Sequence, residues 1–529
     1  MANGKQPAVT RRDLLGMIGT VAGAAAMYQA MAQLGLAAES RYEGPIKLDG
    51  DVKGASVLIL GAGIAGMLAA LELRKAGYKV QVLEYNARAG GRNWTLRGGD
   101  RYTELGGFTQ ECRFDSGLYI NPGPWRIPYH HRGILDYCKR LGVALEPFIQ
   151  VNHNAYLHAR NAFGGKPQRY RHVATDFQGH VAELLAKATS QGKLDETVSK
   201  EDREILLSAL RSWGALDKDY VYKAGEWVSD HRGYEKDPGG GLTAEPTPSQ
   251  PIALHDILSS GLWLQLSTGN FYEYQQTLFQ PVGGMDMIGK AFVREVGDLI
   301  RFNARVTAIR QDERGVSVSY EDTTAPGKPL EARADWCLCT IPLSILSQIE
   351  MNVSSPMQNA INAVPYAPAV KLGLQFKRRF WEEDEAIYGG ITYTDLPIRQ
   401  IGYPSGYFGS GKGVLLGGYA FGAYAYEFTA LPPEERVRRA VEWGAMIHPQ
   451  YREEFENGVA VGWHRVPFTL GCYGQWSDAA RKEHYANLCQ IDGRIALAGE
   501  HASYIPAWQE GAVLSSLDVI SRLHKRVIG

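Results

Sequence analysis

The chain has 529 residues, of which 45% are hydrophobic and 21% charged, and its formal net charge is −1. This length is sufficient for two or three domains with substantial buried cores. A net charge so near zero gives no support for a nucleic-acid partner. The six cysteines do not form a disulfide framework, and no two of them have zinc-ligand spacing, so no metal site is expected.

The first element along the chain is a targeting segment, residues 1–38. Arg11 and Arg12 precede an apolar stretch rich in Gly, Ala and Met, in the pattern of a twin-arginine export signal. The alternative is an uncleaved membrane anchor. Gln29 and Gln33 interrupt the stretch and strong hydrophobes are missing from it, so no stable anchor is expected. We therefore expect export of the folded protein by the twin-arginine pathway, to the periplasm or the exterior.

The next segment, Val57 to Arg92, predicts a strand, a glycine-rich turn, a helix and a second strand. Gly61 permits the tight turn, Gly63 lets the backbone approach a pyrophosphate, and Gly66 lets the helix pack closely on the strand. Glu84, at the end of the second strand, suits a pair of ribose hydroxyls. The alternative is a plain glycine turn. The trailing sequence GGR agrees with the rest of the pattern, and the whole is typical of a flavin dinucleotide site.

The middle of the chain predicts further elements. Helical spacing between Ala174 and Ala215 indicates an inserted helical subdomain, and Asp237 to Pro251 reads as a Gly/Pro-rich loop. The run QPVGGMDMIGKAFVREVG predicts a glycine turn and a helix, followed by two strands that turn at Glu313 to Gly315. Strand-like runs between Asn352 and Trp463, such as VKLGLQF and GVLLGGYAF, predict a separate sheet. That sheet is the candidate substrate domain.

The C-terminal sequence GRIALAGEHASYIPAWQEGAVLSSLDVISRL predicts a buried strand, a polar turn with Gly499 and Glu500, and a helix beginning near Glu510. With these motifs the chain after about Lys53 resembles the flavin amine oxidase family, and within it the bacterial FAD-dependent L-amino acid oxidases. The similarity is patchy in the helical insert. It implies an α/β fold with a discontinuous Rossmann-like FAD-binding domain, a mixed-sheet substrate-binding domain and a helical subdomain. The implied boundaries are 53–110, 278–345 and 470–529 for the first, 111–165 and 346–469 for the second, and 166–277 for the third.

The resemblance also implies FAD as the cofactor and assigns the residues that hold it. The equivalent of Glu500 hydrogen-bonds the flavin ribitol, the backbone of Val306 meets the adenine, and the helix behind Trp508 presents its positive end to the flavin. The residues so assigned are Gly61, Gly63, Ala65, Gly66, Glu84, Gly91, Arg92, Gly107, Trp125, Arg126, Val306, Trp463, Gly499, Glu500, Trp508 and Ala512.

Arg126, in GLYINPGPWRIPYHH, decides the expected substrate class. Its place resembles that of the carboxylate-binding arginine of L-amino acid oxidases, and a guanidinium holds a carboxylate through two parallel charge-assisted hydrogen bonds. The alternatives are a structural ion pair with a protein acid and a contact with the flavin. Tyr403, in IGYPSG, resembles the tyrosine that gives the carboxylate a second contact.

Five residues concern the chemistry. Lys371 matches the family lysine that holds a water near the flavin and assists oxygen reduction; an ordinary solvated lysine is the alternative. Trp463 and Tyr473 match an aromatic pair beside the flavin, with Trp508 as the opposite wall of the substrate cage. Core packing is the alternative for each ring. Cys472 stands where monoamine oxidases attach FAD covalently, but a small residue in a glycine turn favours noncovalent FAD.

The expected activity is oxidative deamination of a small-molecule L-amino acid by hydride transfer to FAD, with dioxygen as the second substrate. The products are a 2-oxo acid, ammonia and hydrogen peroxide. The alternatives are a monoamine oxidase, an amino acid 2-monooxygenase and an exported nucleotide-binding protein without activity. The sequence leaves the side-chain preference and homo-oligomerisation open.

Overall fold

The computed structural model describes residues 40–194, 198–242 and 245–529, so the expected export segment 1–38 lies outside the described residues. Its nucleotide unit consists of strand β1 (Ser56–Leu60), helix α2 (Ile64–Lys75) and strand β2 (Lys79–Leu83). The two strands are parallel and adjacent, from Ser56 opposite Lys79 to Leu60 opposite Leu83. With α2 between them they form a β-α-β unit, the arrangement that binds dinucleotides in many open α/β sheets.

A six-stranded sheet is built around this unit in the order β12-β2-β1-β16-β24-β23. Its other strands are β12 (Ile300–Arg301), β16 (Trp336–Cys339), β24 (Ile495–Leu497) and β23 (Ile491–Asp492). All neighbours are parallel except β23, which is antiparallel to β24. The sheet therefore joins strands from three separate stretches of the chain.

Both faces of the parallel sheet are covered, which explains why β1 is a continuous hydrophobic run. Val57 and Ile59 face a core formed with α2, α3 (Arg132–Arg140), α8 (Asp286–Val296) and α16 (Gln509–Ile528). Leu58 and Leu60 face a second core, because alternate side chains of a strand point to opposite sides. This second core contains the four-stranded sheet β15-β14-β13-β17 and α9, α10 and α15. Their bounds are β13 (Ala304–Gln311), β14 (Val316–Asp322), β15 (Pro329–Ala334), β17 (Glu350–Met351), α9 (Leu343–Leu346), α10 (Ser355–Asn362) and α15 (Asp478–Leu488).

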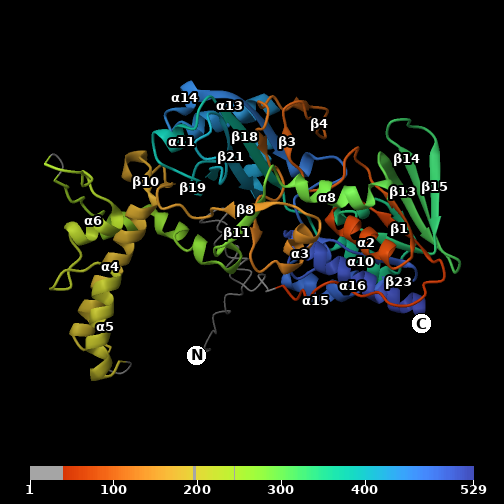
Figure 1. The fold of residues 1–529 in the computed structure, drawn as a ribbon, viewed down its shortest axis with the longest axis horizontal. Helices are drawn as coiled ribbons and strands as arrows, with labels where there is room; N and C mark the ends of the chain where they lie inside the picture. The colour runs from red at the N-terminus through yellow and green to blue at the C-terminus, as the bar shows by residue number, and fades with distance from the viewer. Residues whose placement is uncertain (1–39, 195–197, 243–244) are drawn as a thin grey trace, which may run out of the picture.

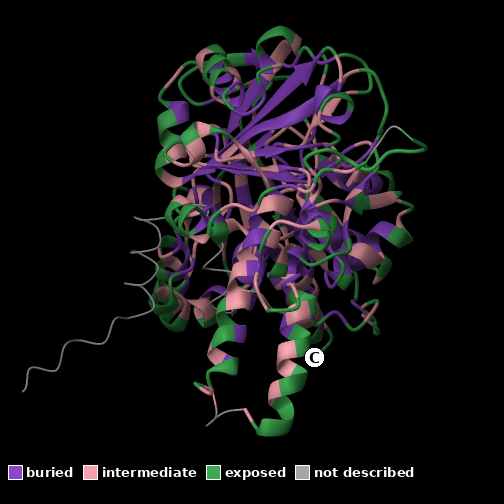
Figure 2. Ribbon diagram, turned by 90° about the vertical axis from the view of Figure 1, so that its left-hand side faces the viewer, coloured by how far each residue is buried: buried purple, intermediate pink, exposed green. Residues whose placement is uncertain are grey.

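A seven-stranded sheet forms the second layer of the molecule, above the parallel sheet in Figure 1, in the order β10-β9-β19-β20-β21-β18-β22. Its strands are β9 (Tyr156–His158), β10 (Gln168–Arg169), β18 (Ala369–Phe376), β19 (Ile391–Thr394), β20 (Gln400–Gly402), β21 (Gly413–Phe421) and β22 (Phe455–Gly462). Strand β18 is buried along its whole length, because β21 and β22 flank it. Figure 2 shows these central strands as the buried centre of this layer. The covering helices are α11 (Phe380–Glu383), α12 (Gly422–Thr429), α13 (Pro433–Gly444) and α14 (Tyr451–Glu454).

Small sheets connect the two layers. A three-stranded sheet, β7-β11-β8, lies between them in Figure 1, with β7 (Ile127–Pro128), β8 (Leu145–Phe148) and β11 (Leu278–Pro281). Two ribbons pair β3 (Leu96–Arg97) with β6 (Tyr119–Ile120), and β4 (Arg101–Thr103) with β5 (Thr109–Glu111). The β7 strand directly follows Arg126 and so fixes its backbone.

The inserted segment is helical, as its spacing predicts. Helices α4 (Tyr170–Ser190) and α5 (Lys200–Trp213) project from the body as an arm, with α6 (Glu226–Arg232) beside them (Figures 1 and 2). Arg232 on α6 and Asp176 on α4 form a buried ion pair of 2.9 Å that fastens the base of the arm. The segment continues through α7 (Leu254–Ser260) and the short 3₁₀ turns Leu262–Gln265, Thr268–Asn270 and Tyr272–Tyr274 back to β11.

The described ranges contain no candidate membrane span, no candidate metal site and no disulfide bond. No helix there is both long and apolar enough to cross a membrane. No group of three or more His, Cys, Asp or Glu side chains in these ranges could hold a metal ion. The six cysteines, all of which lie in the described part, are free thiols.

Candidate active site

A cavity lies along the carboxyl ends of the parallel strands, the edge at which open α/β sheets bind ligands. Gly61, Glu84, Thr340 and Gly499 follow β1, β2, β16 and β24 closely, and all four line it. The cavity has about 1450 Å³ of space free of protein atoms, partly open to solvent. Of the residues predicted from the sequence, it is lined by Gly61, Gly63, Ala65, Glu84, Gly91, Arg92, Trp125, Arg126, Val306, Trp463, Tyr473, Gly499, Glu500, Trp508 and Ala512.

The glycine turn after β1 has the geometry that its sequence predicts. Gly61 has φ +102°, a conformation open to glycine. A methyl group on Gly66 would lie 2.0 Å from the Gly61 carbonyl oxygen, so glycine is needed there for helix α2 to pack on the turn. On Gly63 a methyl group would meet no atom of the described chain within 4 Å. Gly63 thus leaves the N-terminus of α2 open toward the cavity, where a pyrophosphate would bind.

Glu84 is buried at the end of β2 and faces this turn. Its carboxylate accepts hydrogen bonds from the backbone N–H of Ala62 (2.7 Å) and of Asn86 (2.8 Å). The Asn86 side-chain amide donates a third bond at 2.7 Å. These three bonds orient the carboxylate, and its remaining lone pair suits a ribose hydroxyl donor. Tyr85 and Phe468, which the sequence analysis missed, stack at 4.4 Å between ring centroids and line the cavity beside Glu84.

An ion pair forms part of the cavity lining. The Arg92 guanidinium lies 2.7 Å from the Glu500 carboxylate, which also accepts from the backbone N–H groups of Gly474 and Ala507. The positive charge of Arg92 and these hydrogen bonds lower the pKa of Glu500 against the opposing effect of burial. The pair joins the GGR motif to the C-terminal motif, two segments far apart in sequence.

Arg126 also lines the cavity. It is only 8% exposed, and within the described chain its Nε and Nη1 atoms have no hydrogen-bond partner. Its guanidinium is instead surrounded by the rings of Tyr274 (4.3 Å), Trp125 (5.2 Å) and Phe148 (5.9 Å). Two buried guanidinium nitrogens without an acceptor are costly, so this geometry favours an anionic ligand over the predicted alternative of a structural ion pair.

Lys371 on β18 is not a solvated lysine, because it is only 2% exposed. Its ammonium donates to the backbone carbonyls of Gly123 and Asn121 and lies 4.5 Å from the Tyr419 ring. Burial lowers the pKa of Lys371 to about 7. Lys371 is therefore a titratable group just behind the cavity wall formed by Gly123 and Tyr419.

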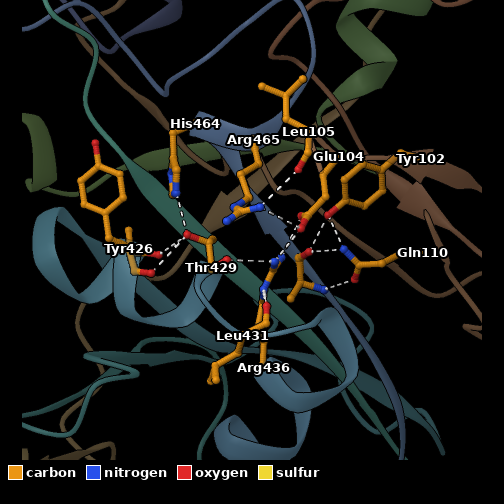
Figure 3. Close-up of polar contacts among 12 residues, drawn as sticks. Tyr102, Glu104, Leu105, Gln110, Tyr426, Thr429, Leu431, Arg436, His464 and Arg465 are labelled. Atoms are coloured by element: carbon orange, nitrogen blue, oxygen red, sulfur yellow. Dashed lines mark hydrogen bonds and ion pairs between the residues drawn. The ribbon is translucent and has the colours of Figure 1, made fainter. Parts of the chain in front are cut away.

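The walls of the cavity are aromatic, as predicted. Trp463 donates from its indole Nε1 to the carbonyl of Pro122 at 2.7 Å, and Trp508 is the residue just before α16. Figure 3 shows the polar network that supports the turn containing Trp463: His464 bonds Thr429, and Arg465 and Arg436 both face Glu104.

Two predicted site residues lie elsewhere, so both predictions are corrected. The Tyr403 hydroxyl is buried in the seven-stranded layer, bonded to Thr392 and His448 at 2.7 Å each, and lines a separate cavity. Gly107 lies in the exposed turn between β4 and β5, where its backbone N–H bonds the Glu104 carbonyl. Neither residue lines the site cavity. Tyr419, which the sequence analysis missed, does line it.

The pairing of β18 with β21 explains the position of Tyr419. Lys371 and Tyr419 are direct partners in this antiparallel pair, so their side chains share one face of the sheet. Tyr419 could therefore be assigned to the site only if the register between β18 and β21 were known, and the sequence alone does not give that register.

Cys472 lines the cavity, near Arg92 and Lys371. Burial raises the pKa of the Cys472 thiol to about 11, although the two cations act in the opposite direction. Its backbone carbonyl accepts a hydrogen bond from Arg92 at 2.9 Å. The side chain is thus a neutral thiol at neutral pH, the form least suited to nucleophilic attack.

The parallel sheet, open glycine turn and aromatic cavity are typical of a protein that binds a nucleotide cofactor. The chain belongs to the family of flavin containing amine oxidoreductases, whose model matches residues 64–520. It is 28% identical to the L-amino-acid oxidase of Siganus canaliculatus, over 89% of this chain and 86% of that protein. It is also 28% identical to the L-amino-acid oxidase of Vipera ammodytes ammodytes, over 87% of this chain and 91% of that protein.

Solved structures agree on the fold. A redesigned putrescine oxidase has a TM-score of 0.59 and 19% identity, over 89% of this chain and 99% of that one. The cyclohexylamine oxidase of Brevibacterium oxydans IH-35A has a TM-score of 0.58 and 17% identity, with the same coverage. The family implies a flavin cofactor, and the open cradle at Gly63 with the buried carboxylates Glu84 and Glu500 fits one.

Proposed function

We propose that this protein is an FAD-dependent L-amino acid oxidase that converts its substrate to a 2-oxo acid, ammonia and hydrogen peroxide. The observation that carries the proposal is Arg126, a buried guanidinium in the cavity with two unpartnered nitrogens among the described residues. An amine substrate offers no anion to such a group, whereas the α-carboxylate of an amino acid does. The relatives named L-amino-acid oxidase support the same substrate class.

The residues of the chain hold the substrate in place. Arg126 binds the carboxylate through parallel N–H donors. Tyr419, which also lines the cavity, donates a further bond from its hydroxyl. Trp508 and Tyr473 enclose the α-amine with apolar surface and offer it no competing nucleophile. FAD, when bound, accepts a hydride from the substrate α-carbon and passes the electrons to dioxygen. The released imine hydrolyses in water.

Lys371 serves the oxygen reaction. Its ammonium is held by two backbone carbonyls behind the Tyr419 ring, so it adds positive charge to the site without contacting the carboxylate. A fixed positive charge favours the anionic species that form as oxygen is reduced. The role of Lys371 is electrostatic and depends on its being protonated.

The cofactor is FAD and is bound noncovalently. Glu84 offers its carboxylate to a ribose, and the start of β13, which contains Val306, lines the cavity for the adenine. The raised pKa of the Cys472 thiol disfavours a thioether to the flavin. Acid precipitation tests this: yellow colour in the supernatant supports noncovalent FAD, and flavin retained in the pellet contradicts it.

Export is the remaining part of the proposal. The segment 1–38 has the twin-arginine pattern, and the folded protein would leave the cytoplasm with its flavin bound. Replacing Arg11 and Arg12 together by Lys should leave the active protein inside the cell. Unchanged export of that variant would rule out the twin-arginine route.

A peroxide assay tests the proposed activity. It compares the common L-amino acids, their D-enantiomers, and the amines formed by replacing the carboxylate with hydrogen. The proposal expects peroxide and ammonia from one or more L-amino acids, with much lower kcat/KM for the matching amines. Preferential turnover of the amines would make the protein a monoamine oxidase. Release of carbon dioxide with an amide product would make it an amino acid 2-monooxygenase.

A further inference from the structure

Glu510 is a fully buried acid whose role in the site is not explained by flavin or substrate contact. It is the second residue of α16, and its two carboxylate oxygens accept from the backbone N–H groups of Gly133 (2.9 Å) and Ile134 (2.8 Å) in the first turn of α3. The hydroxyl of Ser40 donates a third hydrogen bond. One side chain on α16 therefore caps the N-terminus of another helix.

The close approach of the two helices is built into the sequence. A methyl group on Gly133 would lie 2.9 Å from a Glu510 carboxylate oxygen and 2.8 Å from Val513. Glycine at this position of α3 lets the carboxylate reach the two backbone donors. The three donors that hold Glu510 in the described chain are all neutral, and no ion pair neutralises it.

The residues next to this junction form the cavity wall. Trp508 and Gln509, directly before Glu510, line the cavity, and so does Ala512 directly after Gly511. His131, the residue before α3, packs edge-on against the Trp508 indole at 5.0 Å between ring centroids. The Glu510 carboxylate thus fixes the start of both helices at the wall that would face the flavin.

The electrostatic consequence follows from the helix dipole. The N-terminus of α16 carries partial positive charge, which favours electron density on a flavin in front of it. A carboxylate in the first turn of α16, bonded to the N-terminus of α3, offsets part of that field from both helices. Because the junction is buried, water screens this interaction weakly.

We propose that Glu510 is a positioning residue that locks the N-termini of α3 and α16 together and, through its charge, holds down the electron affinity of the bound flavin. The inference rests on the flavin cofactor of the family and is independent of the amino acid as substrate. It predicts that removal of the charge, with the shape kept, makes the flavin a better electron acceptor.

The Glu510→Gln variant tests this with two measurements that need no turnover. One is the flavin reduction potential, and the other is the Kd for sulfite, an anion that adds to flavins more tightly when the surroundings are more positive. The expected result is a higher potential and a sulfite Kd lowered at least about fivefold. The matched control is Asp518→Asn, an exposed acid further along α16 that pairs with Arg522 at 2.7 Å, which should change neither quantity. A Glu510→Gln protein that binds flavin with wild-type potential and sulfite affinity would overturn the proposal.

Two further variants separate charge from structure. Glu510→Asp keeps the charge but shortens the side chain, so it should lower Tm while the potential stays near that of the wild type. Ser40→Ala removes only the hydroxyl donor. Burial raises the pKa of Glu510 and the Ser40 hydrogen bond lowers it, so the variant and the wild type are compared at alkaline pH, where the carboxylate is ionised in both. There the carboxylate is less screened in the variant, so the potential should fall and the sulfite Kd should rise. If Glu510→Gln fails to fold, Ser40→Ala decides the question, since a rise or no change in potential would contradict the proposal.

Discussion

Two buried cations, Arg126 and Lys371, stand a short distance apart in the site, and burial affects them differently. A guanidinium remains charged in proteins, so Arg126 can serve as a permanent anchor for an anion. The ammonium of Lys371, with its pKa lowered to about 7 by burial, loses its proton within the physiological range. Under the proposed function, Arg126 contributes affinity for the substrate carboxylate, and Lys371 makes the oxygen reaction sensitive to pH.

The proposed role of Lys371 predicts how the rate of flavin reoxidation changes with pH. Lysine is charged below its pKa, so the rate of flavin reoxidation by oxygen should fall as pH rises through about 7. Lys371→Met should reoxidise at least about tenfold more slowly and lose this pH dependence. Stopped-flow measurement of both half-reactions checks this. Equal slowing of flavin reduction and reoxidation would place Lys371 in substrate binding or folding instead.

A matched pair of tyrosine variants tests the corrected carboxylate contact. Tyr419→Phe should raise KM for the amino acid about tenfold, because it removes a hydrogen bond to a charged group. Tyr403→Phe should leave KM unchanged and lower Tm, because it strips Thr392 and His448 of their shared partner. The reverse pattern in steady-state kinetics and thermal melts would restore Tyr403 as the contact.

Some residues that line the cavity could be predicted from the sequence and others could not. Arg126, Glu84 and Glu500 were predictable, because each stands beside a motif whose backbone geometry follows from glycine or proline. Tyr419 was not, because its place depends on the register between β18 and β21. Tyr274, whose ring lies 4.3 Å from the Arg126 guanidinium, comes from the helical insert, and only tertiary packing brings it there.

At the scale of elements, the β1-α2-β2 unit was the most predictable part of the fold. Its strands are hydrophobic runs, its turn needs glycine, and β13 and β14 pair around the turn predicted at Glu313 to Gly315. The three-stranded sheet β7-β11-β8 was not predicted, because β7 has only two residues and pairs with β11, some 150 positions further along the chain. Short strands of this kind have no periodicity to detect.

Two glycines of the first turn give a prediction at this scale. Gly66→Ala should destabilise the protein by about 2–4 kcal/mol, because its methyl group would overlap the Gly61 carbonyl oxygen. Gly63→Ala should leave the stability of the apoprotein within about 0.5 kcal/mol of the wild type, because the methyl group has room and φ is −75°. The same variant should bind FAD at least about tenfold more weakly, because the methyl group would occupy the approach to the pyrophosphate.

Apoprotein melts and a flavin fluorescence titration measure these two effects. If Gly63→Ala binds FAD with wild-type affinity, the pyrophosphate does not lie against this turn. Loss of apoprotein stability in that variant would instead show that the turn has no free space.

At the scale of the whole molecule, contacts between segments distant in sequence stabilise the cavity wall. The seven-stranded layer and the β4-β5 ribbon are joined by Arg436 of α13 and Glu104, a fully buried pair 2.6 Å apart (Figure 3). This network lies under the turn that holds Trp463 in the cavity wall. The stability of the site therefore depends on a contact between residues 332 positions apart.

Removal of one partner of this pair should be costly. Glu104→Gln should lower the free energy of unfolding by about 3–5 kcal/mol, since it leaves the Arg436 charge buried and uncompensated. The exposed pair of Arg310 and Glu350 is the control, and Glu350→Gln should cost less than about 1 kcal/mol. Denaturant unfolding of both variants checks this. Similar small losses in the two would show that the buried pair contributes no more than a surface one.

The arrangement of the chain into layers was predictable only in part. The sequence motifs indicated that the C-terminal part of the chain returns to the cofactor domain with a buried strand. In the structure this strand, β24, pairs with β16 of the parallel sheet. The capping of α3 by Glu510 and the projection of the α4-α5 arm were not predictable, because they depend on which helix ends meet after the sheet has formed.

Binding of the α-carboxylate by Arg126 can be measured by comparing kcat/KM for two substrates in two proteins. The substrates are the preferred L-amino acid and the amine that lacks only its carboxylate, and the proteins are the wild type and Arg126→Ala. We predict that Arg126→Ala binds FAD normally, loses at least about 100-fold in kcat/KM for the amino acid, and retains its activity toward the amine. An unchanged ratio of the two kcat/KM values in Arg126→Ala would contradict it.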